Sequence, residues 1–179
     1  MADKVERVDR KLVYQGHIFD VYTDYVKVHE DRIAEWDFIK HKGAAAAVAV
    51  LDDGRLLMVK QYRNALDRYT IEIPAGARDS EEEPTEICAA RELEEETGYR
   101  SEHLEFLIRL RTTVAFCDEL IDVYVAKDLI PSKQHLDEDE SIDLEAFTVE
   151  ELCEKIYQGE IQDSKTVASI LAYKDKYLK

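Results

Sequence analysis

Apolar and polar side chains alternate through residues 11–41 of this chain. Alternation with a period of two is typical of strands that bury one face of a sheet. The pattern predicts two or three strands in this region, with turns near Gln15-Gly16 and Glu30-Asp31. The run 44–51 is almost wholly apolar and predicts a buried strand. Asp52-Asp53-Gly54 then predicts a tight turn into a returning strand.

The rest of the chain predicts strands and helices in mixed order. The predicted strands after the turn are 56–61, 70–73, 104–111, 119–126 and 142–147, and the predicted helices are 84–97, 148–158 and 163–177. Pro84 suits the first turn of its helix and Gly98 suits its end. The polar segment 127–141 predicts an acidic loop. This order of elements indicates a mixed α/β or α+β domain with a small N-terminal sheet.

The charge of the chain limits its partners. Its 179 residues have a formal net charge of -16, while 45% of them are hydrophobic, enough for a core. Such an acidic balance argues against binding nucleic acid or an anionic membrane surface, since both need clustered Lys and Arg. Three widely spaced cysteines predict buried or incidental thiols, which suits a cytoplasmic protein. An acidic protein that handles phosphates needs local positive charge, and a divalent cation would supply it.

Three glutamates lie on one side of the predicted helix 84–97. Glu92, Glu95 and Glu96 have i, i+3, i+4 spacing, so their carboxylates converge, opposite a side of mostly small or apolar residues. A divalent cation with oxygen ligands would offset their repulsion. A solvated acidic helix face is the alternative for such a cluster by itself. Arg91 within the cluster and Gly76 upstream favour the metal site.

The segment 76–99 resembles the signature box of the Nudix hydrolases. That box is a Gly, five residues, a Glu, seven residues, and then Arg-Glu-apolar-x-Glu-Glu-x-Gly-apolar. The chain matches the second half at every position from Arg91 to Tyr99. Counting back seven residues gives Glu83 as the first Glu, one residue too far from the Gly, whereas Glu82 breaks the second spacing. We take Glu83, because a loop tolerates an extra residue better than a helix does.

Segments outside the box resemble the ADP-ribose pyrophosphatase branch of this family. These segments are 61–63, 72–76, 116–119, 137–142 and 159–166. The resemblance implies an α/β/α sandwich with a small N-terminal antiparallel β-sheet. It divides the chain into a β-sheet subdomain, 1–42, and a hydrolase domain, 43–179. Members of this branch commonly form homodimers that exchange N-terminal sheets, so the first subdomain would help to complete the partner's site.

The resemblance also implies the reaction and the residues at its centre. ADP-ribose pyrophosphatases split ADP-ribose into AMP and ribose 5-phosphate, and Mg²⁺ is the expected cofactor, with Mn²⁺ possible. Glu92, Glu95, Glu96 and the carbonyl of Ala75 would bind the metal, and Glu95 also counts among the catalytic residues. Arg63 would hold the diphosphate. Without the resemblance, a single arginine after a strand would be taken as a surface residue.

The acidic loop would carry the general base. The segment 137–142 matches the place where these enzymes carry a mobile catalytic glutamate. Glu140 is the first choice for this role and Glu138 the second. A solvated run of acids with no catalytic role is an equal alternative.

Four further residues are candidates for binding the substrate. Trp36, the only tryptophan, would stack on adenine, or it would belong to a core or a dimer interface. Asp37 and Glu72 would accept hydrogen bonds from the substrate, and Glu119 lies in the segment after the box that matches the branch.

Three other functions remain open at this point. The first alternative is hydrolysis of another nucleoside diphosphate compound, such as a nucleotide sugar or a dinucleotide, with the same metal site. The second is a sensor that binds ADP-ribose without cleaving it, although a sensor has no need of a complete metal cluster. The third is an acidic protein-interaction domain without a ligand, and the complete box argues against it.

Overall fold

The computed structural model describes residues 5–29, 32–136 and 140–178. The chain forms two compact units, residues 1–43 together with 111–120, and residues 44–110 together with 121–179. The first unit therefore includes residues 111–120, which follow the expected division at residue 42.

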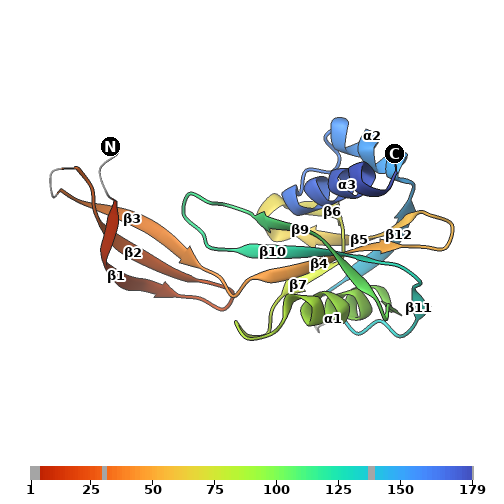
Figure 1. Ribbon diagram of the computed structural model, residues 1–179, viewed down its shortest axis with the longest axis horizontal. Coiled ribbons are helices and arrows are strands. Elements are labelled where there is room, and N and C mark those ends of the chain that lie inside the picture. The colour runs from red at the N-terminus through yellow and green to blue at the C-terminus, as the bar shows by residue number, and fades with distance from the viewer. Residues whose placement is uncertain (1–4, 30–31, 137–139, 179) are drawn as a thin grey trace. The chain divides into compact units, whose positions relative to one another are not determined.

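The first unit is built on a three-stranded antiparallel sheet of β1 (Glu6–Gln15), β2 (Asp20–Lys27) and β3 (Ile33–Lys40) (Figure 1). The predicted N-terminal strands are therefore confirmed. Arg10 of β1 bonds Asp24 of β2 through Nε, 2.5 Å from Oδ1, and its guanidinium lies 3.6 Å from the ring centroid of Phe38 on β3. One side chain thus joins all three strands. The segment 111–120 runs beside β3, where the Ile39 amide donates to the Phe116 carbonyl at 2.7 Å.

The second unit contains a seven-stranded sheet in the order β12-β5-β4-β10-β9, with β6 paired to β5 and β7 paired to β4. Its strands are β4 (Ala44–Val50), β5 (Leu56–Arg63), β6 (Arg68–Glu72), β7 (Ala75–Ala77), β9 (Leu104–Arg111), β10 (Leu120–Ala126) and β12 (Ile142–Phe147). The short strands β8 (Tyr99–Arg100) and β11 (Ile130–Pro131) pair with each other. The helices are η2 (Asn64–Leu66), α1 (Thr85–Thr97), α2 (Val149–Tyr157) and α3 (Ser164–Tyr177).

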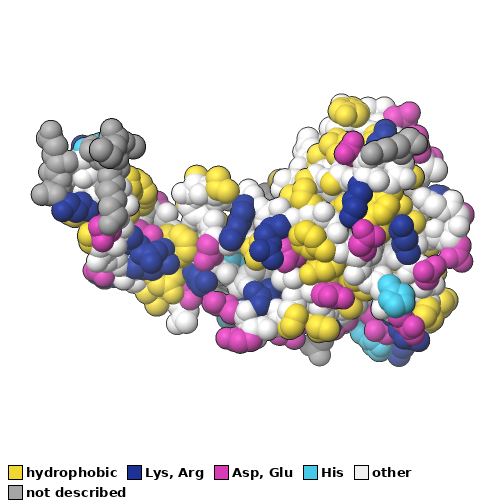
Figure 2. Space-filling view, in the orientation of Figure 1, with side chains coloured by type: hydrophobic (Ala, Val, Ile, Leu, Met, Phe, Trp, Pro, Cys, Tyr) yellow, Lys and Arg dark blue, Asp and Glu magenta, His cyan; other side chains and the backbone are white. Residues whose placement is uncertain are grey.

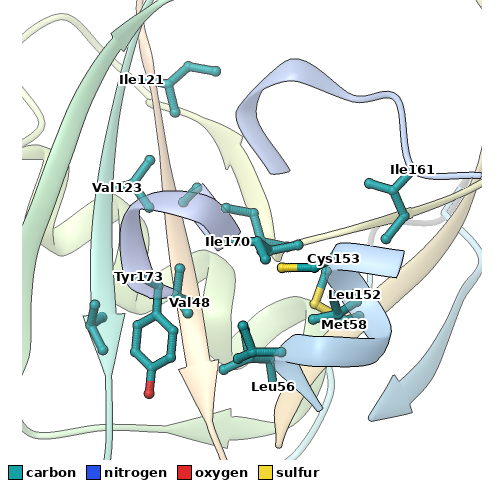
Figure 3. Close-up of a cluster of buried hydrophobic side chains, with 14 of the residues drawn as sticks. Val48, Leu56, Met58, Ile121, Val123, Leu152, Cys153, Ile161, Ile170 and Tyr173 are labelled. Atoms are coloured by element: carbon teal, nitrogen blue, oxygen red, sulfur yellow. The ribbon is translucent and has the colours of Figure 1, made fainter. Parts of the chain in front are cut away.

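Helix α1 covers one face of this sheet, and α2 and α3 cover the other (Figure 1). The predicted α/β/α sandwich is therefore confirmed. Side chains alternate across β4, so Ala46 and Val48 pack with α2 and α3, whereas Ala47 packs beside Leu93 of α1. Leu152 and Ile170 fill the α2–α3 side of the core (Figure 3). Small residues on β4 let both helical layers approach the sheet closely.

The structure adds elements that the sequence did not predict. The additions are the short strands β7, β8 and β11 and the single turn η2, all too short to show a hydrophobic period. The segment 127–141, predicted as a loop, contains β11. Helix α1 begins at Thr85 with Pro84 as its N-cap. Cys88 and Cys153 are buried free thiols, as expected, and Cys117 is partly buried.

Two further features concern the charge of the surface and the composition of the helices. Acidic and basic side chains are interspersed over the face of the molecule that Figure 2 draws. No helix within the described residues combines the length and the apolar composition that crossing a bilayer requires.

Candidate active site

Helix α1 carries the glutamate cluster, but its three carboxylates do not share one solvent-facing side. Glu96 is buried, with 4% of its surface exposed, near the fully buried Leu93. Its Oε2 accepts a hydrogen bond from the Ala75 amide at 2.9 Å. Glu96 is therefore buried rather than exposed on a solvated helix face, although it stays one turn from Glu92, whose charge acts on it. The reason is tertiary, because α1 packs against both β4 and β7 and so covers more of its circumference than one helical stripe.

Glu92 lies against the backbone of Gly76. A Cβ atom added at Gly76 would come within 2.2 Å of the Glu92 carboxyl carbon. No side chain fits there, so the glycine of the box makes room for a carboxylate of the box. The side chain of Glu92 is 13% exposed, so its carboxylate is largely desolvated.

Arg91 links the remaining acids of the box. Its Nη1 lies 2.6 Å from Glu92 Oε1 and 2.9 Å from Glu95 Oε2, and its Nε lies 3.2 Å from Glu83 Oε1. Glu82 is exposed, and its amide donates to the hydroxyl of Ser80. Glu83 is therefore the glutamate that the box arginine holds. The extra residue is accommodated in the loop before it.

Electrostatics at this cluster favour a bound cation. Burial raises the pKa of Glu96 to about 8, and the charges of Glu92 and Glu140 add to this effect although the Ala75 amide opposes it. Burial likewise raises the pKa of Glu92 to about 7, against the opposing bond from Arg91. Glu140 therefore lies within electrostatic reach of the box carboxylates. Desolvated carboxylates that repel one another are ligands that Mg²⁺ and similar hard cations accept.

In this conformation the carboxylates of Glu92, Glu95 and Glu96 do not converge on one metal position. Across the described residues, no three His, Cys, Asp or Glu side chains are arranged to hold an ion. The cause is visible, since Arg91 bridges Glu92 and Glu95 while the Ala75 amide holds Glu96. The carboxylates of Glu92 and Glu96, packed against Gly76 and Ala75, are nevertheless oxygen donors that fit a divalent cation.

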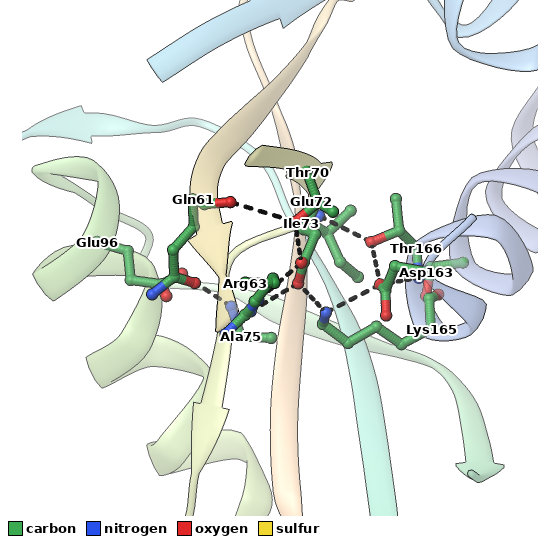
Figure 4. A network of polar contacts seen from close by, with 11 residues as sticks. Gln61, Arg63, Thr70, Glu72, Ile73, Ala75, Glu96, Asp163, Lys165 and Thr166 are labelled. Carbon is green, nitrogen blue, oxygen red and sulfur yellow. Dashed lines mark hydrogen bonds and ion pairs between the residues drawn. The ribbon is translucent and has the colours of Figure 1, made fainter. Parts of the chain in front are cut away.

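A second group of charges fixes Arg63 at the end of β5. Arg63 donates from Nε and Nη2 to the two oxygens of Glu72, at 2.8 and 2.7 Å. Glu72 also accepts bonds from Thr70 and from the Lys165 ammonium, which itself bonds Asp163 at 2.9 Å (Figure 4). Burial of Glu72 disfavours its charge, but the bonds from Arg63 and the charge of Lys165 outweigh burial and lower its pKa to about 2.

This network changes the expected role of Glu72. With 3% of its surface exposed and four hydrogen bonds accepted inside the protein, Glu72 holds Arg63 in place. Sequence reasoning did not single out Lys165. The signal available was Asp163, whose side chain caps α3 and bonds the lysine two residues later. The charge of Glu96 acts on Arg63, so the two groups are neighbours in the second unit.

Gln61 lies on the same face of the sheet, two residues before Arg63 on β5 (Figure 4). Its Oε1 is buried and has no hydrogen-bond partner in the described part of the chain. The strand that follows Glu140 begins at Ile142, directly opposite Gln61. An amide oxygen without a partner, close to buried carboxylates, is a further sign that this region takes a cation with its water.

The other predicted site residues have separate surroundings. Trp36 and Asp37 belong to the first unit, where they line a cavity of about 730 Å³ together with Val21, Phe116 and others. Glu119, also in the first unit, accepts a hydrogen bond from Thr112 at 2.6 Å. Glu138 lies outside the described residues.

Comparison with known proteins gives one family and several relatives. The family model described as NUDIX domain matches residues 40–170. The chain is 36% identical to the ADP-ribose pyrophosphatase of Bacillus subtilis, over 91% of this chain and 89% of that protein. It is 38% identical to the methanol dehydrogenase activator of Bacillus methanolicus, over 88% of this chain and 86% of that protein. A solved structure of an ADP compounds hydrolase superposes with a TM-score of 0.85 at 19% identity, over 98% of this chain and 95% of that one.

Proposed function

The chain belongs to the NUDIX domain family, and on this basis we propose that it hydrolyses the diphosphate bond of ADP-ribose to AMP and ribose 5-phosphate. One observation carries this proposal. The largely desolvated carboxylate of Glu92 lies against Gly76, the buried carboxylate of Glu96 lies against Ala75, and Arg63 is anchored within electrostatic reach of Glu96 by Glu72. The similarity to an ADP-ribose pyrophosphatase over nearly the whole chain supports this choice among diphosphates.

Members of the family generally need a divalent cation. We propose Mg²⁺, with Mn²⁺ as a substitute, bound by Glu92, Glu95, Glu96 and the carbonyl of Ala75. When bound, such a cation lowers the pKa of water and stabilises charge on phosphate oxygens. Binding of the cation would require Arg91 to release Glu92 and Glu95, which it bridges in the present conformation. Glu95, with 40% of its side chain exposed, is the member most free to turn.

Arg63 would bind the diphosphate in the substrate. Its guanidinium is bonded to Glu72 on one side, yet 39% of its side chain is exposed. The second cation on Glu72, Lys165, compensates part of that carboxylate's charge. Arg63 therefore keeps positive charge for an anionic ligand, and its position is fixed before the ligand arrives.

Glu140 would accept a proton from the attacking water. Its charge acts on both Glu92 and Glu96, which supports a position near the reacting centre. Glu138 is the second choice. Replacing each glutamate by glutamine in turn distinguishes the two candidates. Loss of the general base should lower kcat by about a hundredfold or more, whereas loss of the other glutamate should leave kcat unchanged.

The cavity of the first unit would bind the base of the nucleotide. Trp36 has half its surface exposed, and Phe116 also lines the cavity. Aromatic faces of this kind stack on adenine, and Asp37 and Glu119 would accept hydrogen bonds from the ligand. A Trp36→Ala variant should raise KM for ADP-ribose, while Trp36→Phe should keep it near the wild-type value.

The first unit also supports a homodimer. Its sheet and the connection between β1 and β2 expose apolar side chains that a monomer would leave in water, namely Val8, Leu12, Val13, Tyr14, Phe19 and Ile33. An apolar surface of this kind is typical of protein interfaces. Analytical ultracentrifugation at micromolar concentration should give twice the mass of the chain, and Leu12→Asp with Val13→Asp should give the monomer.

The function is tested by supplying Mg²⁺ and a panel of ADP-ribose, nucleotide sugars and dinucleotides, and measuring release of nucleoside monophosphate. ADP-ribose should be cleaved with the highest kcat/KM. Glu96→Gln should lose most activity, while the exposed Glu86→Gln on the same helix should retain it. Arg63→Ala should raise KM, and Arg68→Ala on the same hairpin is its control. A panel without any turnover would exclude the hydrolase, and preference for another diphosphate would exclude only the substrate.

A further inference from the structure

A short segment, residues 132–135, lies on the C-terminal end of α1, and we call it the strap. The last carbonyl groups of a helix have no partner within the helix. The strap supplies partners to two of them and to the carbonyl of Gly98, the residue that caps the helix. The His135 amide donates to the Glu95 carbonyl at 2.9 Å, Gln134 Nε2 to the Glu96 carbonyl at 2.7 Å, and the Ser132 amide to the Gly98 carbonyl at 2.7 Å.

The fold brings the strap to this position by two features. Strands β11 and β8 pair just before it, with Ile130 opposite Arg100. Gly98 then ends the helix with φ of 69°, and a Cβ atom there would lie 3.0 Å from the Gln134 amide nitrogen. The glycine of the box thus ends the helix and also makes room for the strap.

The strap begins the segment that leads to Glu140. Downstream, the same segment is fixed where Ile142 enters β12 opposite Gln61. Glu140 therefore lies between two anchored points, and one of them is the backbone of the metal-binding helix itself. The strap bonds the main chain of Glu95 and Glu96 rather than their carboxylates.

We infer that Gln134 is a positioning residue, whose bond to the Glu96 carbonyl fixes the root of the segment that carries Glu140 and so sets the distance between Glu140 and the carboxylates of α1. This inference rests on the proposed hydrolase function. In this role Gln134 contacts neither the metal nor the substrate. Of the strap's three described bonds to the carbonyls of Glu95, Glu96 and Gly98, only that of Gln134 is made through a side chain, so it can be removed without changing the backbone.

Three consequences distinguish positioning from general stability. Gln134→Met, which keeps the length but lacks the donor, should lower kcat about tenfold, because misplacing a reacting group by a fraction of an ångström has effects of this size. KM and the Mn²⁺ dissociation constant, measured by calorimetry, should stay at wild-type values. Amide hydrogen exchange in residues 132–135 should become faster. The control is Lys133→Met, at an exposed position of the same strap.

A double-mutant cycle with Glu140→Gln provides the decisive test. If Gln134 acts through Glu140, Gln134→Met should have no further effect on kcat once Glu140 is replaced. Multiplying effects, a changed Mn²⁺ affinity, or unchanged hydrogen exchange would each overturn the inference. Gln134→Glu, which also lacks the donor at neutral pH, serves if the methionine variant does not fold. An inactive wild-type protein would count against the hydrolase itself, whereas an active one with multiplying effects counts against the strap.

Discussion

Replacing Glu72 by glutamine should destabilise the second unit strongly at neutral pH. The buried carboxylate accepts bonds from Arg63, Lys165 and Thr70, and Lys165 in turn bonds Asp163. Its pKa falls from 4.5 to about 2. At ~1.36 kcal/mol for each pKa unit, ionised Glu72 contributes ~3 kcal/mol to folding. Breaking a buried ion pair costs about 3–5 kcal/mol, and the lower end applies because Arg63 is partly solvated.

The sign of the pH dependence follows from the lowered pKa. The stabilisation is complete well above pH 4.5, and it is lost as the pH falls toward the folded-state pKa of about 2. From the linkage relation, the contribution of Glu72 to the free energy of unfolding is ~1.4 kcal/mol at pH 3. Urea denaturation of wild type and Glu72→Gln should therefore differ by ~3 kcal/mol at pH 7 and by less than half of that at pH 3. The exposed Glu154→Gln on α2 is the control. A difference under ~1 kcal/mol at pH 7, or one that does not shrink in acid, would refute the assigned role of the network.

Three other changes have defined outcomes. Gly76→Ala places a Cβ atom 2.2 Å from the Glu92 carboxyl carbon, so the Mn²⁺ dissociation constant measured by calorimetry should rise at least ~10-fold; an unchanged constant would mean that Glu92 is not a ligand. Gly98→Ala forces a side chain onto a residue with φ of 69° and should cost about 1 kcal/mol in urea denaturation, a loss that Glu86→Ala should not show. Excess Mg²⁺ should stabilise the wild type by ~2.7 kcal/mol at a hundredfold excess over Kd. Glu96→Gln should abolish that gain in thermal unfolding, and because burial raises the pKa of Glu96 to about 8, the variant should lose little metal-free stability.

Most of the fold could be predicted because its main elements carry their own patterns. The apolar run of β4, the alternation of β1 to β3 and the periodicity of the helices are local properties of the chain. The capping box of α2, in which Thr148 and Glu151 bond each other's backbone, is also written in neighbouring residues. The short strands β7, β8 and β11 could not be predicted, because each forms only through a partner that is distant in the sequence.

The site divides in the same way. The box from Gly76 to Gly98 identifies its glutamates from spacing alone, since helical geometry places Glu92 and Glu96 one turn apart. Spacing says nothing of what the rest of the fold places around that turn. It therefore missed that Glu96 is buried beneath β7.

The sequence by itself determined that this chain is a mixed domain of helices and strands with an acidic helix suited to a divalent cation, because the periods of strands and helices and the spacing of the box are local. The sandwich arrangement came from the resemblance that the box carries. Only the tertiary structure decided how those acids are used. Glu83 rather than Glu82 meets Arg91, Glu72 is held by Arg63 and Lys165, and the strap from β11 closes the end of α1. Each of these contacts joins residues from separate elements. Their energies depend on burial and mutual distance, which exist only once the chain has folded.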